Sequence, residues 1–116
     1  MISSINEFNN QNNDIEGVRL ICCIFFPQDF RKYENLRTFD LVQCTYDTRF
    51  LNLKCFRNLI QIKIDGLKDP SPLSNCTSCK ALSLNSEIRS LKFVSPMRQL
   101  VELSLGIAPE FQRQQL

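Results

Sequence analysis

The pair Cys76-x-x-Cys79 has the spacing at which two thiolates bind zinc or form a redox-active dithiol. A structural zinc site takes about four ligands, usually from two such pairs. The chain has 6 cysteines and no histidine, and the other cysteines offer no second pair at this spacing. Both thiols also stand where corresponding segments carry apolar residues, and a thiol packs as a small apolar group. We therefore favour two core cysteines and keep a zinc or redox protein as an alternative function.

The chain offers few groups for acid–base or nucleophilic catalysis. Without histidine it lacks the commonest general base at neutral pH. Asp40 and Asp65 fall on neighbouring segments of the chain, but basic residues stand in the same area, which favours solvated ion pairs over a catalytic pair. The glycines Gly17, Gly66 and Gly106 are isolated and build no phosphate-binding loop. We expect a protein that is not an enzyme and needs no cofactor or metal.

The elements that position these residues follow from an apolar phrase that recurs along the chain. Its first copy is Ile15-x-x-Val18-x-Leu20, and further copies begin at residues 36, 59, 79 and 100. The spacing between the starts is 21, 23, 20 and 21 residues, and self-similarity at this period predicts a stacked repeat array. Alternating apolar residues predict one short strand per copy, with one face in the core. The segments between strands return the chain to the same edge, so the strands must be parallel.

The phrase resembles the core of the leucine-rich repeat family, L-x-x-L-x-L-x-x-N/C-x-L. The first two copies match its full length, with Cys23 and Cys44 at the Asn/Cys position. Later copies keep the first three apolar positions, and in the fourth Ile88 and Leu91 indicate that the pattern resumes one residue early. The resemblance covers about residues 15–107. It implies an α/β solenoid with a curved parallel sheet of about five short strands, whose concave face binds partners.

The segments between the strands are expected to fill the other side of the core. Prolines after the third and fourth strands limit regular helix there and predict extended and 3₁₀ pieces, whereas residues 50–59 can form one or two helical turns. The apolar residues expected on this side are Phe26, Phe30, Tyr33, Leu51, Leu53, Phe56, Leu73, Leu91, Phe93 and Met97.

Residues that point out of the strands form the candidate partner-binding surface on the concave face. Arg19, Asp40 and Lys63 alternate in charge on neighbouring strands, and opposed unlike charges stabilise a sheet by about 0.2–1 kcal/mol each. The alternative is a solvated face whose charges satisfy one another. The face carries no aromatic residue, so a binding hot spot centred on tryptophan or tyrosine is not expected. The candidate residues are Arg19, Thr38, Asp40, Gln61, Lys63, Asp65, Ser83, Asn85, Glu102 and Ser104.

Charge and hydropathy limit the classes of partner that the chain can bind and the cellular compartment that we expect for it. A net charge of +2 gives no field strong enough to recruit nucleic acid or an acidic membrane. Residues 1–14 are polar and lack the features of a secretory signal, so we expect a mobile tail. The densest apolar run, residues 18–26, is shorter than the roughly 20 residues that cross a bilayer. Reduced cysteines agree with a cytoplasmic or nuclear protein.

The two edges of the predicted sheet are a second candidate surface, because an uncovered edge strand tends to pair with another chain. The tail before Ile15 is too polar to cap a core, and residues 108–116 form a tail or a partial cap, with Ile107 and Phe111 as its apolar side chains. We expect a protein-interaction module that binds a protein or peptide through its concave face or its ends. The alternatives are a structural subunit or segment of a longer array held by its edges, and end-to-end self-association.

Overall fold

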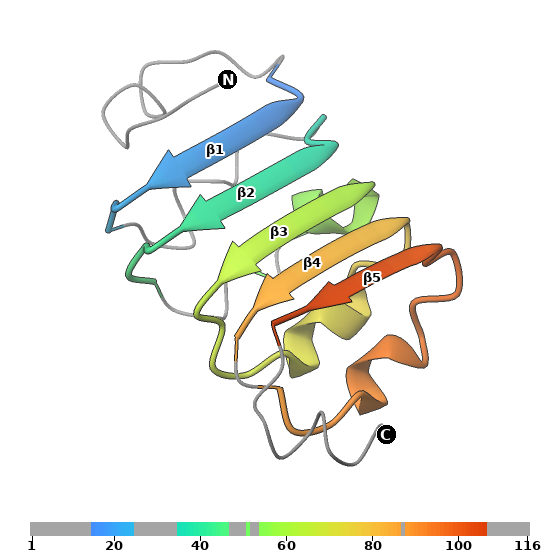
Figure 1. The fold of residues 1–116 in the computed structure, drawn as a ribbon. Helices are drawn as coiled ribbons and strands as arrows, with labels where there is room; N and C mark the ends of the chain where they lie inside the picture. The colour runs from blue at the N-terminus through green and yellow to red at the C-terminus, as the bar shows by residue number, and fades with distance from the viewer. Residues whose placement is uncertain (1–14, 25–34, 47–50, 52–53, 87, 107–116) are drawn as a thin grey trace.

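A computed structural model of the chain describes residues 15–24, 35–46, 51, 54–86 and 88–106. Five parallel strands form one sheet in the order in which they occur along the chain (Figure 1). The parallel sheet agrees with the five predicted strands and is consistent with the α/β class, although the helices are few and short. The strands are β1 (Gly17–Ile21), β2 (Thr38–Val42), β3 (Gln61–Asp65), β4 (Ala81–Asn85) and β5 (Glu102–Leu105).

The strands pair in a register that aligns the repeated phrase from one copy to the next. Along β2, Phe39 and Leu41 are buried while Asp40 between them stays partly exposed, as the period of two in a strand requires. The first apolar position of every strand forms one core row, and the second forms another. The two rows are Val18, Phe39, Ile62, Leu82 and Leu103, and then Leu20, Leu41, Ile64, Leu84 and Leu105.

Short 3₁₀ helices in the return segments lie on one side of the sheet (Figure 1). They are η3 (Lys54–Asn58), η4 (Ser71–Asn75) and η5 (Lys92–Val94). Proline stands at the start of η4, where its fixed φ is tolerated, so the expected 3₁₀ pieces after β3 and β4 are confirmed. The helical turns expected within 50–59 appear as η3.

Apolar side chains from these returns complete the core. Leu51, Phe56, Leu73, Phe93 and Met97 are buried, as predicted. The rings of Phe39 and Phe56 meet edge to face with centroids 5.0 Å apart, an arrangement that adds about 0.5–1.5 kcal/mol beyond the burial of their area. Cys76 and Cys79 are fully buried in the same core, which confirms their predicted inward positions.

The residue after each of the first three strands adopts a left-handed backbone conformation. The φ angles are 55° at Cys22, 52° at Gln43 and 71° at Gly66. A side chain raises the energy of this conformation by roughly 1–2 kcal/mol, so only Gly66 adopts it without strain. Ser86, which follows β4, does not have a positive φ. The early resumption predicted for this copy is confirmed at Ile88, which is fully buried, whereas Leu91 is only partly buried against the core.

The two ends of the sheet differ in how well their core residues are covered. Val18 and Leu20 of β1 are fully buried, whereas Leu103 of β5 is 39% exposed and Val101 just before it is 81% exposed. Both edges were expected to be uncovered; within the described residues, exposed apolar positions of the phrase are found at the β5 edge and not at the β1 edge. The expected tails at 1–14 and 108–116, the cover by Ile107 and Phe111, and the core positions Phe26, Phe30, Tyr33 and Leu53 lie outside the described residues.

Substitutions on the two faces of β4 test the register. Leu82 is 2% exposed, so Leu82→Asp places an unpaired charge in the core at a cost of several kcal/mol, and we expect loss of the cooperative thermal transition by circular dichroism. Ser83→Asp, one residue later on the partly exposed face, should keep the folded spectrum. Equal behaviour of the two variants would contradict the observed register.

Candidate functional site

All the predicted partner-binding residues lie on the face of the sheet opposite the core, and we call this surface the polar face. The strand register places them in three rows across neighbouring strands, and every one is partly or fully exposed. The first row holds Thr38, Gln61 and Glu102. The central row holds Arg19, Asp40, Lys63, Ser83 and Ser104. The third row holds Asp65 and Asn85.

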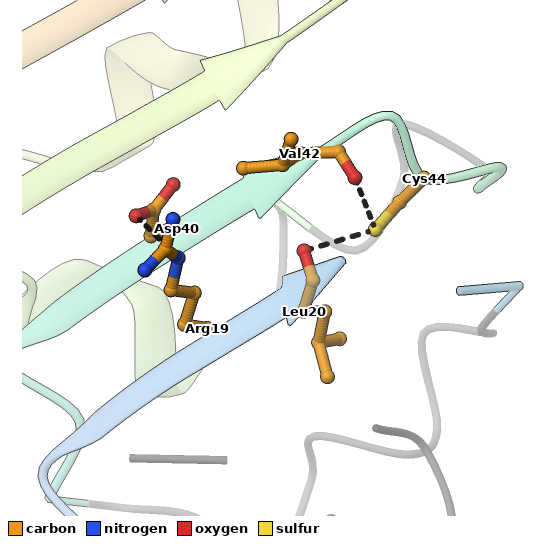
Figure 2. Close-up of polar contacts among 5 residues, drawn as sticks. All are labelled: Arg19, Leu20, Asp40, Val42 and Cys44. Atoms are coloured by element: carbon orange, nitrogen blue, oxygen red, sulfur yellow. Dashed lines mark hydrogen bonds and ion pairs between the residues drawn. The ribbon is translucent and has the colours of Figure 1, made fainter. Parts of the chain in front are cut away.

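One ion pair links β1 and β2 on the polar face (Figure 2). Arg19 Nε lies 3.4 Å from Asp40 Oδ2, with side-chain exposures of 48% and 24%. Pairs this exposed contribute about 0–1 kcal/mol to stability. Asp40 also stands beside Lys63 in the register, yet Arg19–Asp40 is the only ion pair found among the described residues. The predicted alternation of charge is thus present, but it leads to pairing at one step only.

The second carboxylate oxygen of Asp40 is left without a partner. Oδ1 is buried and accepts no hydrogen bond from any described residue. An unsatisfied buried acceptor costs about 1–3 kcal/mol. The Asp40 side chain as a whole is 24% exposed, so the carboxylate lies at the surface although Oδ1 is covered.

Cysteines at the ends of β1 and β2 hold the backbone of these strands together. The thiol of Cys44 donates to the carbonyl oxygen of Leu20 in the preceding strand at 3.2 Å and to that of Val42 at 3.5 Å (Figure 2). Cys23 donates in the same way to Ile21 at 3.3 Å. Burial raises the pKa of the Cys44 thiol, which keeps the single thiol hydrogen that the two carbonyl oxygens share. These cysteines act as backbone-capping donors.

The Cys76-x-x-Cys79 pair is arranged for packing. Cys79 donates to the carbonyl oxygen of Ala81 at 3.2 Å, and burial raises the pKa of its thiol. A raised pKa disfavours the thiolate that acts as nucleophile or metal ligand. Within the described ranges, no group of three or more cysteine, aspartate or glutamate side chains is placed to hold a metal ion.

Tyr46, in the turn that follows β2, reaches across to the end of β3. Its hydroxyl donates to the carbonyl oxygen of Asp65 at 3.4 Å. Burial, assisted by the nearby Cys44 and Asp65, raises the pKa of Tyr46 to about 12. Tyr46 occupies the last apolar position of the full-length phrase, so its place near the core follows from the sequence, whereas its hydrogen bond does not.

Sequence reasoning missed a cavity of about 730 Å³ between the turns that follow β3 and β4. Its walls come from residues 66–71, from Ser86 and from residues 89–93 other than Leu91. No motif marks this cavity, because its walls belong to two return segments that share no period. The one feature of the sequence that could have indicated this cavity is the group of basic residues and serines close to the ends of β3 and β4.

Thiol labelling tests the assignment of the cysteines. Cys22 is exposed whereas Cys76 and Cys79 are buried, so we expect a thiol reagent at mildly alkaline pH to modify Cys22 before either of these two. The two core cysteines should react only after unfolding in urea, because burial blocks access and disfavours the thiolate. Peptide mass spectrometry identifies the modified residue. Labelling of Cys76 or Cys79 at the rate of Cys22 in the folded protein would argue against a core role.

Titration of Tyr46 tests the turn that it closes. The chain has 2 tyrosines, so Tyr33→Phe leaves Tyr46 as the only phenol. With its pKa raised from 10.0 to about 12, Tyr46 stabilises the fold below pH 10, and this contribution is lost as the pH rises through about 12. We expect phenolate absorbance to appear at higher pH in the folded than in the urea-unfolded variant. Coinciding curves would mean that Tyr46 is solvated.

Neither the protein-family models nor the curated proteins include a match to this chain. In the part of the chain that the structure describes, no helix combines the length and apolar character needed to cross a bilayer.

Proposed function

We propose that the chain is a non-catalytic protein-interaction module, built as a short leucine-rich repeat solenoid, that binds a protein or peptide on its polar face. Two observations support the repeat assignment. Each copy of the phrase begins two residues before a strand, as Ile15 does before β1 and Leu36 before β2. Each strand also pairs only with the strands of adjacent copies, which is the nearest-neighbour arrangement of repeat arrays.

The observation that carries the proposed binding site is the incomplete pairing of Asp40. This carboxylate stands in the central row between Arg19 on β1 and Lys63 on β3, but among the described residues only Arg19 forms an ion pair with it, with Nε 3.4 Å from Oδ2. Its buried Oδ1 needs a donor, and Lys63 has no ion-pair partner among the described residues. The row therefore offers one acceptor and one cation to a partner, which suits a peptide that carries both charges.

The chemistry of the polar face points to recognition by hydrogen bonds rather than by an aromatic anchor. Its side chains are serine, threonine, amide and charged residues, and Gln61, Asn85 and Glu102 are exposed. Interfaces without tryptophan or tyrosine at the centre usually lack the strongest hot spots. Affinity then depends on several hydrogen bonds spread along neighbouring strands, so we expect an extended partner segment that crosses the strands.

The exposed β5 end favours one second candidate function, a structural segment held by its edges. Leu103 is 39% exposed, whereas its counterpart Leu82 on β4 is 2% exposed. Val101, in front of β5, is 81% exposed. An open strand edge with exposed apolar residues is a template for further pairing, so a neighbouring repeat or subunit placed there would bury these side chains.

We also propose a reducing compartment, the cytoplasm or nucleus. Cys22, Cys23, Cys44, Cys76 and Cys79 carry thiols in the described structure, and none is in a disulfide. Cys44 and Cys79 use their thiol protons in hydrogen bonds to backbone carbonyls, and oxidation would remove these bonds. Structural thiols of this kind persist where the cellular redox buffers keep them reduced.

The experiment is affinity capture from native lysate with two charge exchanges that leave the net charge unchanged. Asp40→Lys/Lys63→Glu alters the central row of the polar face. Glu16→Lys/Lys80→Glu alters exposed residues just outside the strands and serves as the matched control. We expect one protein, identified by mass spectrometry, to be retained by the parent and the control and to bind the polar-face variant at least roughly 30-fold more weakly, about 2 kcal/mol.

The outcome separates the two proposed functions. Retention of the same protein by all three chains would reject the polar face as the binding surface, and the edge-held structural segment would then be favoured. Circular dichroism of each variant shows beforehand that the charge exchange has left the fold intact.

A further inference from the structure

The cavity between the turns after β3 and β4 has the size of a small-molecule site. Its volume is about 730 Å³, and pockets for small ligands usually measure roughly 300–1,000 Å³. It lies just beyond the strand ends, since Gly66 directly follows β3 and Ser86 directly follows β4. None of the residues proposed for the polar face lines it. The cavity is therefore separate from the proposed protein-binding surface.

Apolar side chains form part of the cavity wall. Leu67 is 1% exposed and Phe93, from η5, is 6% exposed, and both belong to the core. Pro70 adds a further apolar surface just before η4. These groups are held by the packing of the core, so the wall is preformed. It suits the apolar body of a ligand rather than a fully hydrated ion.

Positive charge predominates among the cavity residues. Among the described residues, Lys68, Arg89 and Lys92 line the cavity together with one carboxylate, that of Asp69. Asp69 is engaged locally, because the backbone N–H of Ser71 donates to its Oδ1 at 3.0 Å. Hydrogen bonds from the backbone and side chain of Ser71 hold the pKa of Asp69 below its usual range. The excess of cations favours an anionic ligand.

Ser86 supplies a buried donor that has no acceptor in the described structure. It is the only buried polar residue found there, at 8% exposed. Its Oγ accepts a hydrogen bond from the backbone N–H of Leu67 at 2.8 Å. A hydroxyl group carries one donor hydrogen besides its acceptor lone pairs, and no described residue accepts this hydrogen. An anionic oxygen in the cavity would accept it and remove the cost of an unsatisfied buried donor.

We propose that this cavity binds a small amphiphilic anion, a phosphate or carboxylate group carried on an apolar body. The Ser86 hydroxyl donates to one anionic oxygen, and Lys68 and Lys92 neutralise the charge at the cavity rim. Pro70 contacts the apolar body above a floor formed by Leu67 and Phe93. Phosphate and carboxylate share this chemistry, since both present only acceptors to the Ser86 hydroxyl and to the lysines.

Isothermal titration calorimetry on the full chain tests the ligand class with four probes. Phenyl phosphate and benzoate each carry an anion on an apolar ring, whereas inorganic phosphate lacks the ring and phenol lacks the charge. We expect at least one of the two aryl anions to bind roughly tenfold or more tightly than both controls, and the tighter aryl anion identifies the preferred head group. Equal binding of inorganic phosphate or of phenol, or no binding of either aryl anion, would overturn the proposal.

Paired variants locate the binding site. Lys68→Gln/Lys92→Gln removes two exposed cations that line the cavity, and Lys80→Gln/Arg98→Gln removes two exposed cations that do not. We expect the first pair to weaken binding of the aryl anion roughly tenfold and the second to change it less than about twofold. All four positions are exposed, so both variants should fold. An equal loss in the two variants would show that only the overall charge matters, and would sink the assignment to this cavity.

Discussion

The in-register pairing of five short parallel strands is the constraint on which the rest of this structure depends. A strand of four or five residues cannot stand alone in water, so each strand requires its neighbours. Because the register aligns equivalent positions of the phrase, Val18, Phe39 and Ile62 meet in one core row, while Arg19, Asp40 and Lys63 meet on the opposite face. A shift by one residue would exchange these two sets. The same strand register therefore determines both the packing of the core and the composition of the polar face.

The turns after the strands show how far a repeat tolerates variation. Gly66 suits its left-handed position, whereas Cys22 and Gln43 hold the same conformation with side chains. The thiols of Cys23 and Cys44 satisfy backbone carbonyls in the first two turns. After β4, the Ser86 hydroxyl instead receives the Leu67 N–H. Different side chains thus form hydrogen bonds with the backbone polar groups that the sheet leaves unpaired at the ends of its strands.

Features that follow from a short period could be predicted from the sequence, and those that depend on irregular segments could not. Alternation placed Leu82 inward and Ser83 outward, and the spacing of the phrase placed Cys76 and Cys79 in the core. The early resumption at Ile88 was also visible. That Lys63 forms no ion pair with a described residue could not be predicted, because rotamers and local geometry decide which charged neighbours meet. Nor could the cavity beside Ser86, since its lining joins two returns with no common pattern. The difference in coverage between β1 and β5 depends on contacts that no repeat pattern encodes.

The exposed end at β5 also gives the molecule a direction of unfolding. Each strand pairs only with its neighbours in sequence, so the sheet can lose strands one at a time from an end without breaking contacts elsewhere. The core residues of β1 are fully buried, whereas those of β5 are partly exposed, so detaching β5 uncovers the least apolar surface. We therefore expect fraying to begin at β5, at the edge of the sheet opposite the Arg19–Asp40 pair.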